Sequence, residues 1–139
     1  MPSSGPIIII EDDCDDQELL REVFNEINLP NILHFFASPK EAFCYLLNTT
    51  EKPFLIISDI NMPVLNGFEL KDKINQNLCL RKKNIPFVFL STNSENDTIA
   101  KAYELLAQGY FVKPVRISDL KEMVLIMIAY WNTSARPFN

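Results

Sequence analysis

The chain has few of the residues on which several common kinds of site depend. Its 139 residues include three glycines, three cysteines and one histidine. No G-x-G-x-x-G pattern follows any apolar run, so a dinucleotide-binding domain is not indicated. The cysteines form neither a C-x-x-C pair nor an even framework, which argues against a metal–thiolate site or a disulfide-stabilised secreted fold. Unpaired cysteines are typical of a reducing compartment.

Positive charge and long apolar runs are also scarce. The 13 Lys and Arg residues are outnumbered by 18 Asp and Glu residues, which gives a net charge of -5 and argues against a nucleic acid or an anionic membrane as partner. No apolar run approaches the ~18 residues of a membrane span, and no signal-peptide pattern opens the sequence. We therefore expect a cytoplasmic protein without membrane insertion. The one basic cluster, at 81–83, is interpreted as a solvated loop.

What the chain does have is enough apolar residues for one core. A hydrophobic content of 47% in 139 residues predicts a single domain over 1–139, with 1–5 and 132–139 as flexible termini. Because so little sequence follows Trp131, we expect no output domain, and so a protein that acts by contact. Every residue at 124–131 is apolar, which favours an exposed interaction surface on the last helix, although a well-covered helix would also fit.

Short apolar runs alternate with segments of helical periodicity. The runs are rich in β-branched and aromatic residues, and their complete apolarity is typical of parallel strands covered on both faces. Five strand–helix repeats predict an α/β fold, a doubly wound five-stranded parallel sheet with five helices. The expected strands are residues 7–10, 32–36, 54–58, 87–90 and 110–112, and the last helix spans about 117–131.

Chemically active side chains follow four of the expected strands. In doubly wound sheets, ligands bind beyond the carboxyl ends of the strands, so these side chains should share one rim. Carboxylates crowded at the end of one strand repel each other, and Mg²⁺ is the cation that best fits one or two carboxylates beside a phosphate. Asp15 and Asp16 are expected only to stabilise the first turn of the following helix. The rim residues are Glu11, Asp12, Asp13, Asp59, Ser91 and Lys113.

Taken in order, these residues resemble the receiver domain of two-component response regulators, the CheY-like family. The motifs that carry the resemblance are Glu11 with Asp12, Asp59-Ile60-Asn61-Met62-Pro63 with Gly67, Ser91, Tyr110, and Lys113-Pro114. Together they span almost the whole chain. The resemblance implies a flavodoxin-like strand order, 2-1-3-4-5.

The resemblance also implies a role for each matching residue. Asp59 would accept a phosphoryl group from a histidine kinase or a histidine phosphotransfer protein. Mg²⁺ would be held by Asp12, Asp59 and the backbone carbonyl of Asn61, with Glu11 acting through a water. Ser91 and Lys113 would contact the phosphoryl oxygens, and Lys113-Pro114 is a candidate cis bond. Ser91 and Tyr110 would form the conformational switch.

Phosphorylation would then alter binding to a downstream protein, or self-association as a homodimer, through the face spanned by 103–131. The chain would be a signalling phosphoacceptor with at most self-catalysed phosphotransfer and dephosphorylation. One departure from the family is Leu106, where many receivers carry glycine, and it leaves the end of the preceding helix in doubt.

Two rival hypotheses were weighed against this one. Haloacid-dehalogenase-like phosphatases also phosphorylate a strand-end Asp, but they require a second Asp two places on, where this chain has Asn61. A receiver fold used as a phosphorylation-independent docking module remains the alternative.

Overall fold

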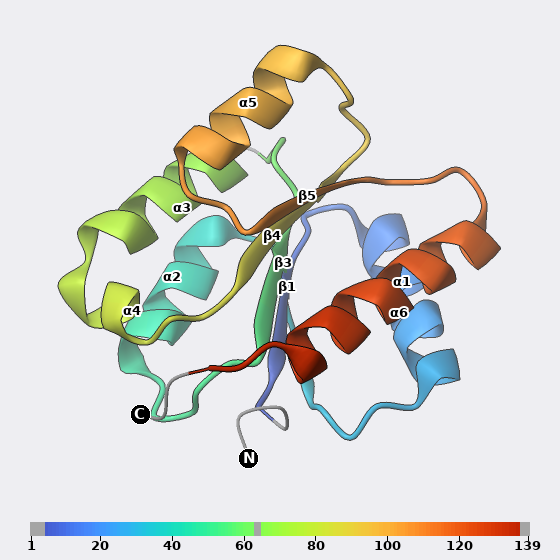
Figure 1. The fold of residues 1–139 in the computed structure, drawn as a ribbon, viewed down its shortest axis with the longest axis horizontal. Helices are drawn as coiled ribbons and strands as arrows, with labels where there is room; N and C mark the ends of the chain where they lie inside the picture. Colours follow the sequence, from blue (N-terminus) through green and yellow to red (C-terminus); the bar gives the residue numbers. More distant parts are fainter. Residues whose placement is uncertain (1–4, 63–64, 137–139) are drawn as a thin grey trace.

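The structure, a computed structural model, describes residues 5–62 and 65–136. Five parallel strands form one sheet in the order β2-β1-β3-β4-β5, which confirms the predicted fold class and strand order (Figure 1). Pro63 of the loop motif lies outside the described residues. The strands are β1 Ile7–Ile10, β2 Leu33–Phe36, β3 Leu55–Ser58, β4 Phe87–Ser91 and β5 Gly109–Val112.

Helices cover both faces of the sheet. The apolar sides of α1 and α6 pack on one face, and those of α2, α3, α4 and α5 pack on the other (Figure 1). No described helix has both the length and the apolar character needed to cross a membrane. The helices are α1 Cys14–Ile27, α2 Pro39–Asn48, α3 Gly67–Gln76, α4 Leu78–Lys82, α5 Asn96–Glu104 and α6 Ile117–Thr133.

The helix α4 was not expected, and it corrects two predictions. The described chain has six helices where five were predicted, and the basic cluster interpreted as a loop contributes Arg81 and Lys82 to the last turn of α4. The side chain of Asn77 accepts a hydrogen bond from the backbone N–H of Leu80 and so caps the start of this helix. Cations in the last turn are favoured by the helix dipole. A cap and two well-placed charges thus stabilise a turn without any apolar periodicity.

The four consecutive isoleucines of β1 each belong to a core. Their side chains alternate across the sheet, so that Ile7 and Ile9 pack with α1 and α6 whereas Ile8 and Ile10 pack on the opposite face. None of the four is more than 1% exposed. Burying a side chain of this size contributes roughly 1.5–3 kcal/mol to folding. The run is therefore a central strand that anchors both layers of helices.

The strand register brings the carboxyl ends of the strands to one edge. Ile10 pairs with Ser58 across β1 and β3, and Ser91 pairs with Val112 across β4 and β5. The pairing continues one residue further, because the Asp59 N–H donates to the Ile10 carbonyl and the Lys113 N–H to the Ser91 carbonyl. The residues that follow these strands consequently lie along one rim.

Three local features bear on the sequence expectations. Lys113-Pro114 is trans, because no cis peptide occurs in the described residues, so the cis bond suggested by the resemblance is not present here. Leu106 adopts the left-handed conformation with φ of 67°, the backbone shape for which glycine is usual. Helix α6 continues to Thr133, into the segment expected to be flexible, and the Arg136 guanidinium lies 4.5 Å over the Phe54 ring.

Candidate functional site

Three acidic residues meet at the carboxyl edge of the sheet. Glu11 and Asp12 follow β1, and Asp59 follows β3. One carboxylate oxygen from each of the three lies within 4.8 Å of the others. This is the cluster predicted from the sequence, and adjacent parallel strands that end at the same level create it. Carboxylate oxygens at such spacing are the donor set that a hard divalent cation prefers.

Burial makes this cluster electrostatically unfavourable on its own. Burial raises the pKa of Glu11 to about 7, with a further increase from the charge of Asp59, although Lys113 acts in the opposite direction. Burial likewise raises the pKa of Asp59, and the charges of Asp12 and Asp16 add to that increase. A bound divalent cation would relieve this repulsion, so the donor set fits Mg²⁺ or a similar ion. Asn61 lies two residues after Asp59, in the loop where the resemblance places a carbonyl ligand.

Lys113 is the cation of the rim. Its Nζ lies 3.1 Å from Oε1 of Glu11 and 3.3 Å from Oδ2 of Asp16. Burial lowers the pKa of Lys113, but the charges of Glu11, Asp59 and Asp16 outweigh burial, so the net shift is upward. The amine is therefore a protonated group with only 10% of its side chain exposed, held among carboxylates.

The predicted switch residues Ser91 and Tyr110 meet at the loop that follows β4. Ser91 is buried, and its Oγ accepts a hydrogen bond from the backbone N–H of Asn93 at 3.1 Å. The hydroxyl of Tyr110 donates to the carbonyl of the same Asn93 at 2.6 Å. One loop residue thus joins a rim hydroxyl to an aromatic side chain of β5. The sequence did not indicate Asn93, because its role depends on how the loop folds back toward β5.

The segment after β3 holds Asp59 in a defined orientation. Oδ1 of Asp59 accepts a hydrogen bond from the backbone N–H of Ile60 at 2.8 Å. Gly67, at the start of α3, passes so close that a Cβ built on it would lie 2.2 Å from the Asp59 carbonyl oxygen. A side chain at position 67 would therefore displace the backbone of Asp59. This close approach explains why a residue without a side chain stands at position 67, beside the candidate site.

The first turn of α1 contributes one further residue to the candidate site, Asp16. Asp13 is the N-cap, and its side chain accepts from the N–H groups of Asp15 and Asp16. Asp16 was expected only to stabilise this turn, yet its carboxylate also pairs with Lys113. No sequence signal indicated this pairing, because it depends on the direction in which α1 leaves β1 relative to the end of β5.

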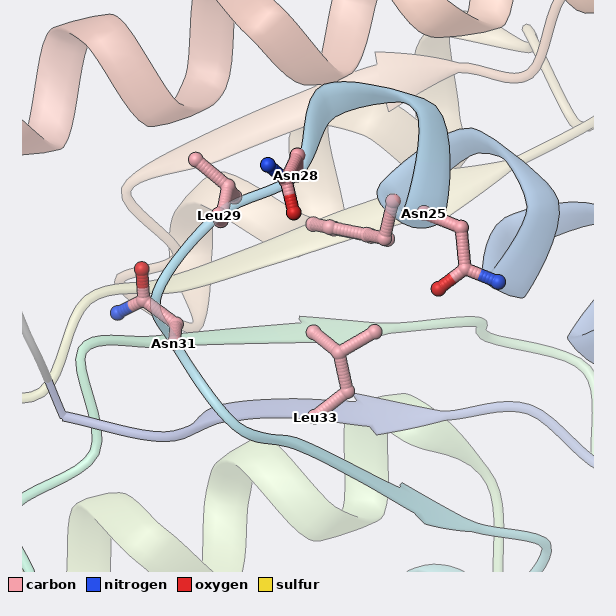
Figure 2. Close-up of a pocket in the computed structure, with 6 residues that line it drawn as sticks. Asn25, Asn28, Leu29, Asn31 and Leu33 are labelled. Atoms are coloured by element: carbon pink, nitrogen blue, oxygen red, sulfur yellow. The ribbon is translucent and has the colours of Figure 1, made fainter.

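A separate hollow of about 140 Å³ lies away from the rim, beside the end of α1 and the beginning of β2. Asn25, Asn28 and Asn31 line it (Figure 2), and Asn28 ends α1 in the left-handed conformation. Asn31 donates from its side chain to the Gly5 carbonyl. The hollow lies at the amino-terminal end of β2, whereas the acidic cluster follows the carboxyl ends of β1 and β3. Of its asparagines, Asn28 ends α1 and Asn31 ties the segment before β2 to Gly5.

Comparison with known proteins identifies one family over most of the chain. The profile of the response regulator receiver domain matches residues 7–125. The response regulator Rcp1 of Synechocystis sp. is 31% identical over 130 residues, which covers 90% of this chain and 87% of Rcp1.

Two crystal structures superpose closely on the fold. One is the phosphorylated cyanobacterial phytochrome response regulator RcpA, with a TM-score of 0.84, 28% identity, and coverage of 95% of this chain and 96% of RcpA. The other is the Mn²⁺-bound form of Rcp1, with a TM-score of 0.83, 28% identity, and coverage of 96% of this chain and 99% of Rcp1.

Proposed function

Because the chain belongs to the response regulator receiver domain family, whose members signal in two-component systems, we propose that it accepts a phosphoryl group on Asp59. The donor is a histidine kinase or a histidine phosphotransfer protein. The observation that carries the proposal is the convergence of Asp59 with Glu11 and Asp12, with Lys113 paired to Glu11 at the same rim. A nucleophilic carboxylate, a cation-binding oxygen set and a fixed ammonium are the parts that phosphoryl transfer requires.

The proposed reaction moves one phosphoryl group. A carboxylate oxygen of Asp59 attacks the phosphorus of a phosphohistidine and forms the acyl phosphate. The P–N bond breaks, its electron pair remains on the imidazole nitrogen, and that nitrogen takes up a proton. Lys113 pairs with one phosphoryl oxygen, and the Ser91 hydroxyl donates to another. Both groups already lie at the rim that carries Asp59.

The residues that would hold a divalent cation are Asp12, Asp59 and the backbone carbonyl of Asn61, with Glu11 contributing through a water. When bound, Mg²⁺ would supply neutralisation of the charge that develops on the transferred group. Support comes from the carboxylate cluster itself and from the Mn²⁺-bound form in which the similar protein Rcp1 was crystallised.

The output of the proposed switch is a change in protein contacts in the cytoplasm. Ser91 and Tyr110 share Asn93, so a shift of Ser91 toward a phosphoryl oxygen would disturb the hydrogen bond of Tyr110. Residues 103–131, which include the end of α5, strand β5 and most of α6, carry exposed apolar side chains, among them Tyr103, Ile126 and Tyr130. We assign binding of a downstream protein, or of a second copy, to this 103–131 face. The chain would act as a signalling phosphoacceptor whose own chemistry is its phosphorylation and dephosphorylation.

Intact-mass analysis after incubation with acetyl phosphate and Mg²⁺ tests the proposal. Wild type should gain one phosphoryl group, and Asp59→Asn should gain none. Equal labelling of the two proteins would exclude Asp59 as the acceptor. Wild type that gains no phosphoryl group from acetyl phosphate, nor from histidine kinases or phosphotransfer proteins, would favour the phosphorylation-independent docking module.

A further inference from the structure

Lys113 has two carboxylate partners, and neither is the proposed phosphoacceptor. Nζ lies 3.1 Å from Glu11 and 3.3 Å from Asp16. The two partners differ in setting. Glu11 is buried and belongs to the candidate cation cluster, whereas Asp16 lies in the first turn of α1, has 38% of its side chain exposed and is outside that cluster.

A phosphoryl group on Asp59 would need the same ammonium. Two of the three N–H donors of Lys113 are engaged by Glu11 and Asp16, so the new anion would compete with both carboxylates for the position and charge of the ammonium. A cation bound in the cluster would offset the charge of Glu11, and Asp16 would then remain as the competing carboxylate. Taking the proposed function as its premise, we propose that Asp16 is a positioning residue that holds Lys113 back from the phosphoryl group. It thereby weakens phosphoryl binding and shortens the lifetime of the phosphorylated state.

The charge of Asp16 acts in the same direction through space. Asp16 contacts the ammonium that would serve the phosphoryl group, so its negative charge repels an anion brought to that ammonium. A phosphoryl group adds further negative charge at the same place. Competition for Lys113 and direct repulsion therefore both oppose the phosphorylated state, so the sign of the predicted effect does not depend on their relative size.

Stabilising the start of α1 does not by itself explain why an aspartate stands at position 16. Asp13 already caps the helix through its side chain. Asp15 places an equal charge in the same turn, and within the described part of the chain it forms no ion pair. What distinguishes Asp16 from Asp15 is the contact with Lys113. The pair therefore supplies a matched control one residue away.

The test measures beryllofluoride affinity at saturating Mg²⁺ and the rate of phosphoryl loss after labelling with acetyl phosphate. We compare wild type, Asp16→Asn, Asp15→Asn and Asp16→Glu. Asp16→Asn should bind beryllofluoride about three- to fivefold more tightly and lose its phosphoryl group more slowly by a similar factor, as expected when a partly exposed ion pair is removed. Asp15→Asn should stay within about twofold of wild type, because Asp15 does not pair with Lys113 and its exposed charge is screened by solvent. Asp16→Glu should restore wild-type values.

Three results would overturn the proposal. Asp16→Asn could match Asp15→Asn, which would mean that the contact with Lys113 has no influence. Asp16→Asn could bind beryllofluoride more weakly, which would make Asp16 an anchor that delivers Lys113 rather than a competitor. Asp16→Glu could behave like Asp16→Asn, which would show that the negative charge at position 16 does not cause the effect. Wild type that neither binds beryllofluoride nor becomes labelled would instead refute the proposed function itself.

Discussion

Two adjacent stretches of the chain place opposite demands on the fold. Ile7–Ile10 is buried on both faces of the sheet and stabilises the two helical layers. Residues 11–16 carry five carboxylates, of which Glu11 is buried with a pKa raised to about 7. The buried strand and the acidic residues of the candidate site are thus direct neighbours in the sequence, because Glu11 follows Ile10. The comparison shows how a strongly apolar strand lets the protein retain a group of charges that the fold alone would not favour.

The largest expected effect tests the apolar side of this comparison. Ile9→Ala should lower the free energy of unfolding by about 2–5 kcal/mol, because it leaves a cavity in a closely packed core. Urea denaturation followed by circular dichroism measures the change. Ile32→Ala, at a position that is 61% exposed, is the control and should change stability by less than about 0.5 kcal/mol. Equal effects of the two variants would contradict the central position assigned to β1.

Lys71 tests whether a charge in the core behaves differently from the charges of the rim. It is 6% exposed on α3, its amine donates to Oδ1 of Asn75, and burial lowers its pKa to about 8. The unfolded chain therefore binds more protons than the folded protein between pH 8 and 10.5, so stability should rise with pH in that window. The contribution of Lys71 to the rise is roughly 2–3 kcal/mol.

Lys71→Met should abolish this contribution, as measured by urea denaturation at several pH values. Lys40→Met, at an exposed position on α2, is the control and should retain the rise. A Lys71→Met protein with the pH profile of wild type would show that Lys71 is not the group that titrates.

The acidic side of the comparison predicts a response to cations. Mg²⁺ at ten times its dissociation constant should raise the free energy of unfolding by about 1.4 kcal/mol, because it binds only the folded protein. Asp12→Asn should lose most of this gain, since it removes a member of the carboxylate cluster. Asp15→Asn should retain it. Thermal unfolding with and without Mg²⁺ measures the difference, and an undiminished gain in Asp12→Asn would place the ion elsewhere.

The smallest expected effect concerns Leu106, which lies far along the chain from both stretches. Its φ of 67° costs a non-glycine residue roughly 1–2 kcal/mol, whereas glycine would lose about 0.5–1 kcal/mol through the greater freedom of the unfolded chain. Leu106→Gly should therefore stabilise the protein by about 0.5 kcal/mol. Leu106→Ala is the control, because it keeps the strain. A destabilised Leu106→Gly protein would mean that the exposed leucine side chain makes a contribution of its own.

The features that could be predicted from the sequence depend on local residue patterns and on parallel strands that end at the same edge of the sheet. The apolar runs, the strand order implied by the family and the meeting of Glu11, Asp12 and Asp59 belong to this class. Each follows once neighbouring strands are parallel and in register, since the residues after them then share one edge.

Other features were not predictable because they depend on tertiary geometry. The pairing of Asp16 with Lys113 requires the direction in which α1 leaves β1 relative to the end of β5. The role of Asn93 requires the path of the loop after β4. Helix α4 is five residues long and has no apolar periodicity, so only its Asn77 cap could have indicated it. For Asp16 and Asn93 the missing information was the orientation of one element relative to another, whereas for α4 it was the lack of a periodic apolar pattern.

The central claim is that the rim binds a phosphoryl group and that the 103–131 face responds. Amide spectra of ¹⁵N-labelled protein, recorded with Mg²⁺ before and after addition of beryllofluoride, test it most directly. The account predicts shifts around Asp12, Asp59, Ser91 and Lys113, a second set from Tyr103 to Trp131, and neither set in Asp59→Asn. Wild-type spectra without shifts at the rim would contradict the phosphoryl site, and shifts confined to the rim would contradict its coupling to the 103–131 face.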